Sequence, residues 1–522
     1  MLPEWTELES RDIEAIQHLR LNELRDCINE VFFPYITLIT PYLRVTSWLV
    51  WIITQIDQER KISKNSFTLR EYEEKTELYY RIFATADVLH ARNSGIEHHG
   101  PVGVDRINSA LTKIEKDEIN FSSFLSGPSI IPIYAYSRAL ENMRLLQSMQ
   151  FSTRRNEFIQ TSTEIGKRLS GEFEKNWNRI IAPHKFVKKT VWTKNALEEL
   201  GEAVCLHGLT KENEESILLL EAATSSLKQP ALFKDLIDIT LLTATRSGSL
   251  NLPFKPQDIG RAALYHSFKA NEAFIPHSLL ETSATAIIAY HELHTHASYG
   301  ADAILAGVSL AAKNRQGGIS QNQIVEEAAK ILANDPIWKP EKQIEDATKE
   351  LSEQFQTSRN TFQTKIPKAD GPYGFETIQD RISQSRQNAF GLTGWGAIAL
   401  LQAACCEECF NAKWLSETFT KHSCVFSSFT FLQELQSLNS KSTIRDWVDR
   451  ATKRTIEQHE DVARSKGPYA RKIDRNNDFI ICTDEPTDYG KNRGRLDTAI
   501  AWISDAGLLN RHENEYRAHS GN

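Results

Sequence analysis

Glycine, proline and cysteine are all scarce in this sequence. Its 522 residues include only 24 glycines and 17 prolines, too few for a collagen-like or a long disordered chain. The seven cysteines are odd in number and form no regular framework, so we expect free thiols in a reducing compartment. The opening stretch MLPEWTELESRDIEAI has neither the basic nor the apolar region of a secretory signal. These features predict a folded, cytoplasmic protein.

Positive charge is not in excess. The formal net charge is −7, which excludes a globally basic nucleic-acid coat but permits a local basic patch. The chain is longer than one hydrophobic core comfortably serves, so several domains are expected. Breaks rich in glycine, proline, serine and asparagine divide it into three helical domains and a carboxy-terminal module, at 1–125, 126–255, 256–440 and 441–522.

Long apolar runs are also rare, with one exception at Phe32–Ile56. That run is long enough to cross a bilayer, but it contains Pro34, Pro41 and Arg44, which a membrane-spanning helix rarely carries. We therefore expect a buried helix that begins after Pro41, and no membrane partner.

Helical periodicity dominates the rest of the chain. Apolar residues recur at steps of three and four in the segments 12–32, 68–91, 137–149 and 195–209. The predicted fold class is mainly α, an irregular multi-helical body that could extend to an α-solenoid-like stack of helix pairs.

The last fifty residues have a different pattern. A short apolar run in RNNDFIICTDEP suits a strand, RGRLDTAIAWISDAGLL suits a helix, and the final thirteen residues suit a hairpin. This order predicts a small α+β winged-helix-like module. Its cations would be DNA-phosphate contacts; the alternative is a solvated helix end followed by a hairpin. These cations are Lys491, Arg493, Arg495, Arg511 and Arg517.

The stretch AYHELHTHASYG, at 289–300, resembles a metal site. It carries His291, Glu292, His294 and His296, but Thr295 occupies the position where the zinc-protease and di-iron helix templates both need a histidine. One interpretation is a buried polar seam, with His291 and His294 on the core stripe and Glu292 and His296 facing outward. The other is the metal centre of a hydrolase or nuclease.

The sequence CCEEC and its surroundings allow two interpretations. The group Cys405, Cys406, Cys409, His422 and Cys424 has ligand types that could hold zinc. However, the residues around CCEEC form one continuous helical pattern without the glycine-bearing knuckles of zinc sites, which favours buried free thiols. No cofactor is expected.

Common catalytic signatures are lacking. There is no Gly-x-Ser-x-Gly elbow and no protein-kinase set. Gly95, Gly100 and Gly103 precede a helix start at Val104, but the loop lacks the lysine and the serine or threonine of a nucleotide-binding loop. A turn is expected there, and GLTGWGAI at 391–398 predicts a close contact between helices.

The segment LRDCINEVFFPYITLITPYLRVTSWLVWIITQI resembles the amino-terminal signature of an uncharacterised bacterial domain-of-unknown-function family. The matching positions are Phe33, Pro34, Arg44 and Trp51; Tyr42 departs from it, because a second basic residue is usual there. The resemblance implies a helical companion of helicases, nucleases and methyltransferases in antiviral defence clusters, with no enzymatic activity to carry over. From its apolar surroundings alone, Arg44 should form an internal ion pair.

The sequence thus favours a non-catalytic component of a multi-protein antiviral defence system that acts through partner proteins and double-stranded DNA. A metal-dependent hydrolase or nuclease that uses His291, Glu292, His294 and His296 stays open as an alternative, as does a pure protein scaffold.

Overall fold

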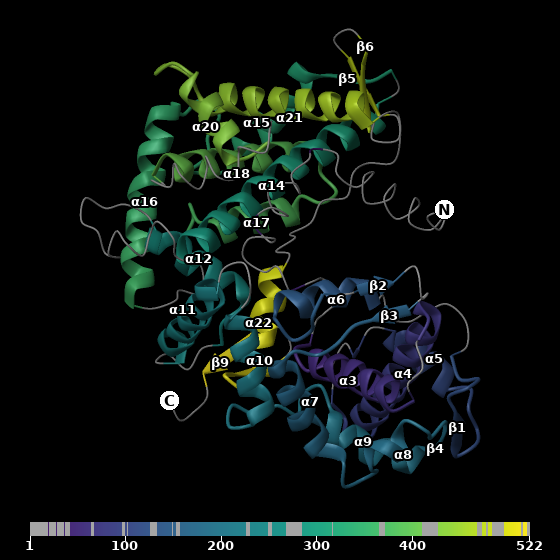
Figure 1. The fold of residues 1–522 in the computed structure, drawn as a ribbon. Coiled ribbons are helices and arrows are strands. Elements are labelled where there is room, and N and C mark those ends of the chain that lie inside the picture. The colour runs from purple at the N-terminus through teal and green to yellow at the C-terminus, as the bar shows by residue number, and fades with distance from the viewer. Residues whose placement is uncertain are drawn as a thin grey trace. The chain divides into compact units, whose positions relative to one another are not determined.

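The structure is a computed structural model of the whole chain. It describes residues 19, 28, 36, 42–63, 67–96, 100–101, 103–125, 133–148, 150–152, 157–225, 230–248, 253–267, 284–315, 317–364, 371–409, 426–466, 472–476, 479–482, 495–512 and 515–518. Helices predominate and the sheets are small, so the predicted mainly α class is confirmed (Figure 1).

The chain forms two compact units, each discontinuous in sequence. Unit 1 comprises residues 1–30 and 257–493, and unit 2 comprises residues 31–256 and 494–522. The segment 441–522, predicted as one module, is thereby divided between them.

Unit 2 contains most of the amino-terminal half and the end of the chain. Its helices are α3 (Val45–Ser63), α4 (Leu69–Ser94), α5 (Val104–Leu111), α6 (Ile133–Asn142), α7 (Glu164–Trp177), α8 (Pro183–Phe186), α9 (Lys194–Val204), α10 (Glu214–Thr224), α11 (Pro230–Gly248) and α22 (Arg495–Asp505). Its described strands form three antiparallel pairs: β1 (Glu118–Asn120) with β4 (Val191–Thr193), β2 (Gln150–Ser152) with β3 (Glu157–Ile159), and β8 (Leu509–His512) with β9 (Glu515–Ala518).

An aromatic cluster fills the core of unit 2. Trp51 of α3 packs edge-on against Trp177 and Phe83, with ring centroids 4.8 and 5.4 Å apart. Such pairs add to the free energy of area burial. Helix α3 begins at Val45 and its first three turns are buried, so the buried helix expected after Pro41 is confirmed.

Local signals set the helix ends of unit 2. Thr68 and Glu71 form a capping box at the start of α4, and Gly95 ends that helix at φ +67°. Gly103 precedes α5 at φ +88°. The turn and helix start predicted for this glycine-rich segment are confirmed.

Unit 1 is built around two long apolar helices. Its helices are α12 (Pro256–Ser267), α14 (Ala284–Lys313), α15 (Gln321–Leu332), α16 (Ile344–Thr364), α17 (Phe375–Gln384), α18 (Ala389–Cys409), α20 (Ser428–Gln436) and α21 (Ile444–Lys466). A three-stranded antiparallel sheet has the order β5 (Ile319–Ser320), β7 (Phe479–Cys482), β6 (Ile473–Asn476).

Helices α14 and α18 lie very close together where Gly300 and Gly396 face each other. A Cβ on Gly300 would lie 2.8 Å from the carbonyl oxygen of Gly396, and a Cβ on Gly396 would lie 2.6 Å from that of Gly300. Only residues without side chains allow this crossing. The close helix contact predicted for residues 391–398 is confirmed.

Helix α18 is also the described helix long and apolar enough to span a membrane. The stretch Ala389–Glu407 has a mean hydropathy of 1.5, and 94% of its best window is buried inside the protein. Burial on this scale is typical of the core helix of a soluble protein.

The carboxy-terminal elements follow the predicted order of strand, helix and hairpin. Strand β7 pairs with β5 and β6 in unit 1, whereas α22 and the β8–β9 hairpin belong to unit 2. The hairpin is fixed in unit 2 by a backbone bridge between Tyr516 and Phe254 and by contacts with α11 (Figure 1).

Candidate functional site

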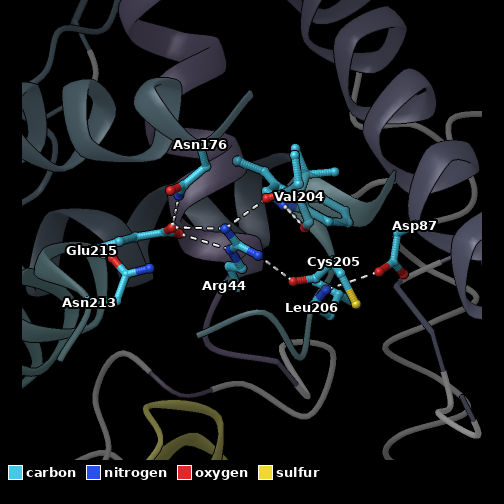
Figure 2. Close-up of polar contacts among 10 residues, drawn as sticks. Arg44, Asp87, Asn176, Val204, Cys205, Leu206, Asn213 and Glu215 are labelled. Carbon is cyan, nitrogen blue, oxygen red and sulfur yellow. Dashed lines mark hydrogen bonds and ion pairs between the residues drawn. The ribbon is translucent and has the colours of Figure 1, made fainter. Parts of the chain in front are cut away.

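Arg44 is the centre of a buried polar cluster in unit 2. Its guanidinium forms a two-pronged ion pair with Glu215, with Nε 3.2 Å from Oε1 and Nη2 3.0 Å from Oε2 (Figure 2). The two side chains are 2% and 0% exposed. The internal ion pair predicted for Arg44 is confirmed, and its partner lies at the first turn of α10.

The same guanidinium also satisfies the end of helix α9. It donates to the carbonyl oxygens of Ala203, at 3.0 Å, and Cys205, at 2.6 Å, while the Trp48 indole donates to that of Val204 at 3.1 Å (Figure 2). The last carbonyls of a helix lack partners within the helix and attract cations. Arg44 therefore joins the end of α9 to the start of α10 through Glu215.

Asp87 holds the other side of the loop that follows α9. Its Oδ1 accepts a hydrogen bond of 3.0 Å from the amide of Leu206, next to the Cys205 thiol (Figure 2). Burial raises the pKa of Asp87 to about 7, although the Leu206 amide and Arg44 oppose the shift. Burial likewise raises the pKa of the Cys205 thiol to about 11, so the thiol is protonated at neutral pH.

The loop held by Arg44 and Asp87 forms one wall of a pocket of about 560 Å³ within unit 2. The turn between α22 and β8 forms the opposite wall. Buried Asp505 lies at the base, whereas the exposed Lys211 and the half-buried Arg511 lie nearer solvent. The lining is completed by His207, Leu209, Thr210, Glu212, Ser504, Gly507, Leu509 and Asn510.

Asp505 is 6% exposed, and its Oδ2 accepts a 3.0 Å hydrogen bond from the amide of Leu43. Burial raises the pKa of Asp505 to about 7, and the Leu43 amide and Arg511 moderate the rise. A carboxyl in this state can donate or accept a hydrogen bond near neutral pH.

The predicted phosphate contacts do not lie on one surface. Pairing in the hairpin places Arg511 opposite Tyr516 and Arg517 opposite Asn510, so the two arginines are on opposite faces. The Arg511 guanidinium lies 5.9 Å from the Tyr516 ring centroid, on the pocket side. Arg517 is exposed on the other face.

The remaining predicted phosphate contacts lie at or before the start of α22. Arg495 is the first residue of that helix and is half-buried. Lys491 and Arg493 lie outside the described residues.

The histidine stretch lies within α14, in the core of unit 1. His291, Glu292, His294 and His296 are 2%, 1%, 1% and 0% exposed. The expectation that Glu292 and His296 face outward is wrong: α12, α17 and α18 cover α14, so its polar residues are buried between helices. Gly260 of α12, for example, leaves room for the Glu292 carboxylate, which a Cβ there would meet at 2.5 Å.

The hydrogen bonds of His296 define its protonation state. The Gln379 side-chain amide nitrogen lies 3.1 Å from Nδ1, and the Gln402 side-chain oxygen lies 2.8 Å from Nε2. An amide nitrogen only donates and an amide oxygen only accepts, so the ring is neutral with its proton on Nε2. The ring stacks on Phe375 at 3.8 Å. His296 therefore joins helices α14, α17 and α18.

Within the described ranges, no three histidine, cysteine, aspartate or glutamate side chains are grouped so that they could hold a metal ion. In that part of the chain, the structure therefore offers no set of three ligands that would support the metal role considered for His291, Glu292, His294 and His296. Cys405 and Cys406 are buried on a continuous α18 and are not joined in a disulfide bond. The Cys409 side chain, His422 and Cys424 lie outside the described residues.

Sequence reasoning does not find Glu215 or Asp505. Asn213 followed by two glutamates signals a helix start, which the structure has. Nothing in the sequence, however, indicates that Arg44 would choose one of those glutamates as its partner. Asp505 stands on an amphipathic helix just before Gly507, where a solvated carboxylate would be the ordinary expectation.

Compared with protein-family models, with curated proteins and with solved structures, this chain matches none.

Proposed function

We propose that the protein is a cytoplasmic, non-catalytic component of a multi-protein antiviral defence system. It acts by binding, through partner proteins of the helicase, nuclease or methyltransferase type and through double-stranded DNA. The resemblance of the segment around Phe33, Pro34, Arg44 and Trp51 supports the defence context, and the carboxy-terminal hairpin supports the DNA contact.

The single observation that carries the DNA contact is the outward face of the β8–β9 hairpin. Leu509 and Tyr516 are both 3% exposed and anchor one face. Asn510 and Arg517 are paired and exposed on the other. An anchored ribbon with a cation and an amide on its outer face can contact phosphate without any change of fold.

Binding of labelled duplex DNA, measured by fluorescence anisotropy over a range of salt concentrations, tests this contact. Arg517→Glu should weaken binding. It should also make the plot of log K against log salt concentration less steep, by about one unit of slope or more for the lost phosphate contact. Lys116→Glu is the matched control, because Lys116 is exposed elsewhere in unit 2 and the variant has the same net charge. Wild-type protein that does not bind duplex DNA, or Arg517→Glu that binds like wild type, would remove the DNA contact and leave the scaffold alternative.

Phage challenge of cells that carry the intact gene cluster tests the defence context. Deletion of this chain should abolish protection, and Arg517→Glu should lower it more than Lys116→Glu does. Full protection after the deletion would overturn the defence role.

A further inference from the structure

The pocket in unit 2 has the features of a preformed ligand site. Its volume of about 560 Å³ lies within the range of small-molecule pockets, roughly 300 to 1,000 Å³. Its base is buried and its rim is polar: Leu209, Asp505 and Leu509 are buried, whereas Thr210, Lys211 and Asn510 are exposed. Apolar and polar groups therefore converge on one concave space.

Both walls of the pocket are held from behind. A Cβ on Gly208 would lie 2.3 Å from Nη1 of Arg44, so the loop lies directly on the guanidinium that also binds Cys205. On the opposite wall, the Ser216 hydroxyl donates to the carbonyl oxygen of Ala506 at 2.8 Å.

The two walls meet at Gly507, whose φ is +77° and where a Cβ would lie 2.5 Å from the amide nitrogen of Lys211. A pocket fixed on both sides loses little entropy when a ligand binds.

The charges of the pocket are arranged by depth. Arg511, held over the Tyr516 ring, and Lys211 come from opposite walls and supply two cations towards solvent. Asp505 lies deeper, and burial raises its pKa to about 7, so its carboxyl can donate or accept a hydrogen bond near neutral pH. The pocket thus has two cations, Arg511 and Lys211, and one acidic side chain, the exposed Glu212, towards solvent, and a hydrogen-bonding carboxyl at its base.

We propose that this pocket binds a phosphate monoester up to the size of a nucleotide. The dianionic phosphate lies between Arg511 and Lys211, and a hydroxyl or amino group of the ligand hydrogen-bonds to Asp505. A phosphate monoester is favoured over a single carboxylate because it carries two negative charges on one group, which the two cations Arg511 and Lys211 match. Asn510 borders both surfaces, but Arg517, the cation of the DNA contact, lies on the face of the hairpin opposite to Arg511.

Isothermal titration calorimetry with adenosine monophosphate, ribose 5-phosphate, inorganic phosphate and succinate tests the proposal on the full chain. Both organic phosphates should bind, and succinate should bind at least about tenfold more weakly, because a charge-assisted hydrogen bond contributes on that order. No binding of either organic phosphate at millimolar concentrations would overturn the proposal. Equal binding of succinate would overturn the choice of phosphate.

Variants in each wall of the pocket can distinguish binding at this specific site from a general attraction of anions to the protein. Arg511→Met and Lys211→Met should each weaken the binding of ribose 5-phosphate about tenfold. Arg517→Met, on the other face of the same hairpin, should change it less than about twofold. Lys211 is exposed, so Lys211→Met tests the site even if Arg511→Met perturbs the hairpin. Wild-type affinity in Lys211→Met, or an equal loss in Arg517→Met, would contradict the site.

Discussion

The amide of Leu43 donates a 3.0 Å hydrogen bond to Oδ2 of Asp505, a residue 462 positions later in the chain. Leu43 is the neighbour of Arg44, whose guanidinium holds the loop of the unit 2 pocket, and Asp505 is the base of that pocket. The pocket is therefore assembled only when the carboxy-terminal segment 494–522 packs into unit 2, so truncation before α22 would remove one complete wall.

The ion pair of Arg44 and Glu215 gives the first prediction. Arg44→Met or Glu215→Gln should each lower the free energy of unfolding by about 3–5 kcal/mol, because each leaves the partner as an uncompensated buried charge or an unsatisfied buried group. The double variant should cost less than the sum of the two, by on the order of 2 kcal/mol, because no charge is then left alone. Urea titration and hydrogen exchange of the segment 203–215 measure both effects.

Arg70 and Glu74 provide the control for this cycle. Their ion pair has side chains 86% and 62% exposed, and exposed pairs contribute little. Arg70→Met should leave the urea midpoint of unfolding almost unchanged. If Arg44→Met were as mild as Arg70→Met, the cluster would not hold the loop as described.

Arg44 also illustrates how far the sequence reaches. A lone cation in an apolar run predicts a buried partner, because an unpaired buried charge is too costly, and periodicity predicts the helices. The identity of the partner depends on which helix start lies beside α3, and that is a property of the tertiary fold. The same limit applies to the histidines of α14: their spacing predicts a polar seam, but Glu292 and His296 are buried because unit 1 covers the helix on more than one side.

The sequence places the two hairpin arginines in one group because both are basic and close together. Their pairing register separates them, since Arg511 is opposite Tyr516 and Arg517 is opposite Asn510. A register cannot be derived from two short strands with an undefined turn, because a slip of one residue exchanges the two faces.

The titration of Asp505 gives the second prediction. Its pKa rises from 3.8 to about 7 on folding, so the folded state holds the proton more tightly than the unfolded state. The tighter binding of the proton therefore adds to the free energy of unfolding. This added stability is fully present below pH 3.8 and is lost as the pH rises through about 7. Asp505→Asn can still accept the Leu43 hydrogen bond but does not titrate. Its Tm relative to wild type should therefore increase between pH 5.5 and pH 8.5, as scanning calorimetry at several pH values can measure.

Asp117→Asn is the control for the pH series, because Asp117 is exposed in unit 2. Its Tm difference from wild type should stay nearly constant over the same range. A difference for Asp505→Asn that is flat or falls with pH would contradict a protonated Asp505 in the folded protein.

The crossing of α14 and α18 gives the third prediction. An alanine at position 396 places its Cβ 2.6 Å from the Gly300 carbonyl oxygen and 2.9 Å from Cγ1 of Ile304, so the helices must separate. We expect a loss of about 1–3 kcal/mol in the free energy of unfolding. At Gly171 of α7 a Cβ would have no other atom within 4 Å, so Gly171→Ala should instead gain about 0.5–1 kcal/mol. A Gly396→Ala protein as stable as Gly171→Ala would show that the crossing is looser than described.

The last prediction separates a structural His296 from a metal ligand. His296→Leu should lower the free energy of unfolding by about 1–3 kcal/mol or more, because Gln379 and Gln402 both lose a buried partner. Nitrogen-15 NMR of histidine-labelled protein should assign His296 to a neutral ring with its proton on Nε2, and the signal should vanish in the variant. Elemental analysis should give the same metal content for wild type and His296→Leu. The His296 ring accepts a hydrogen bond from Gln379 and donates one to Gln402, so it has no nitrogen lone pair left for a metal. A stoichiometric metal that is lost in His291→Ala or His296→Leu would therefore contradict this structural role and support the hydrolase alternative.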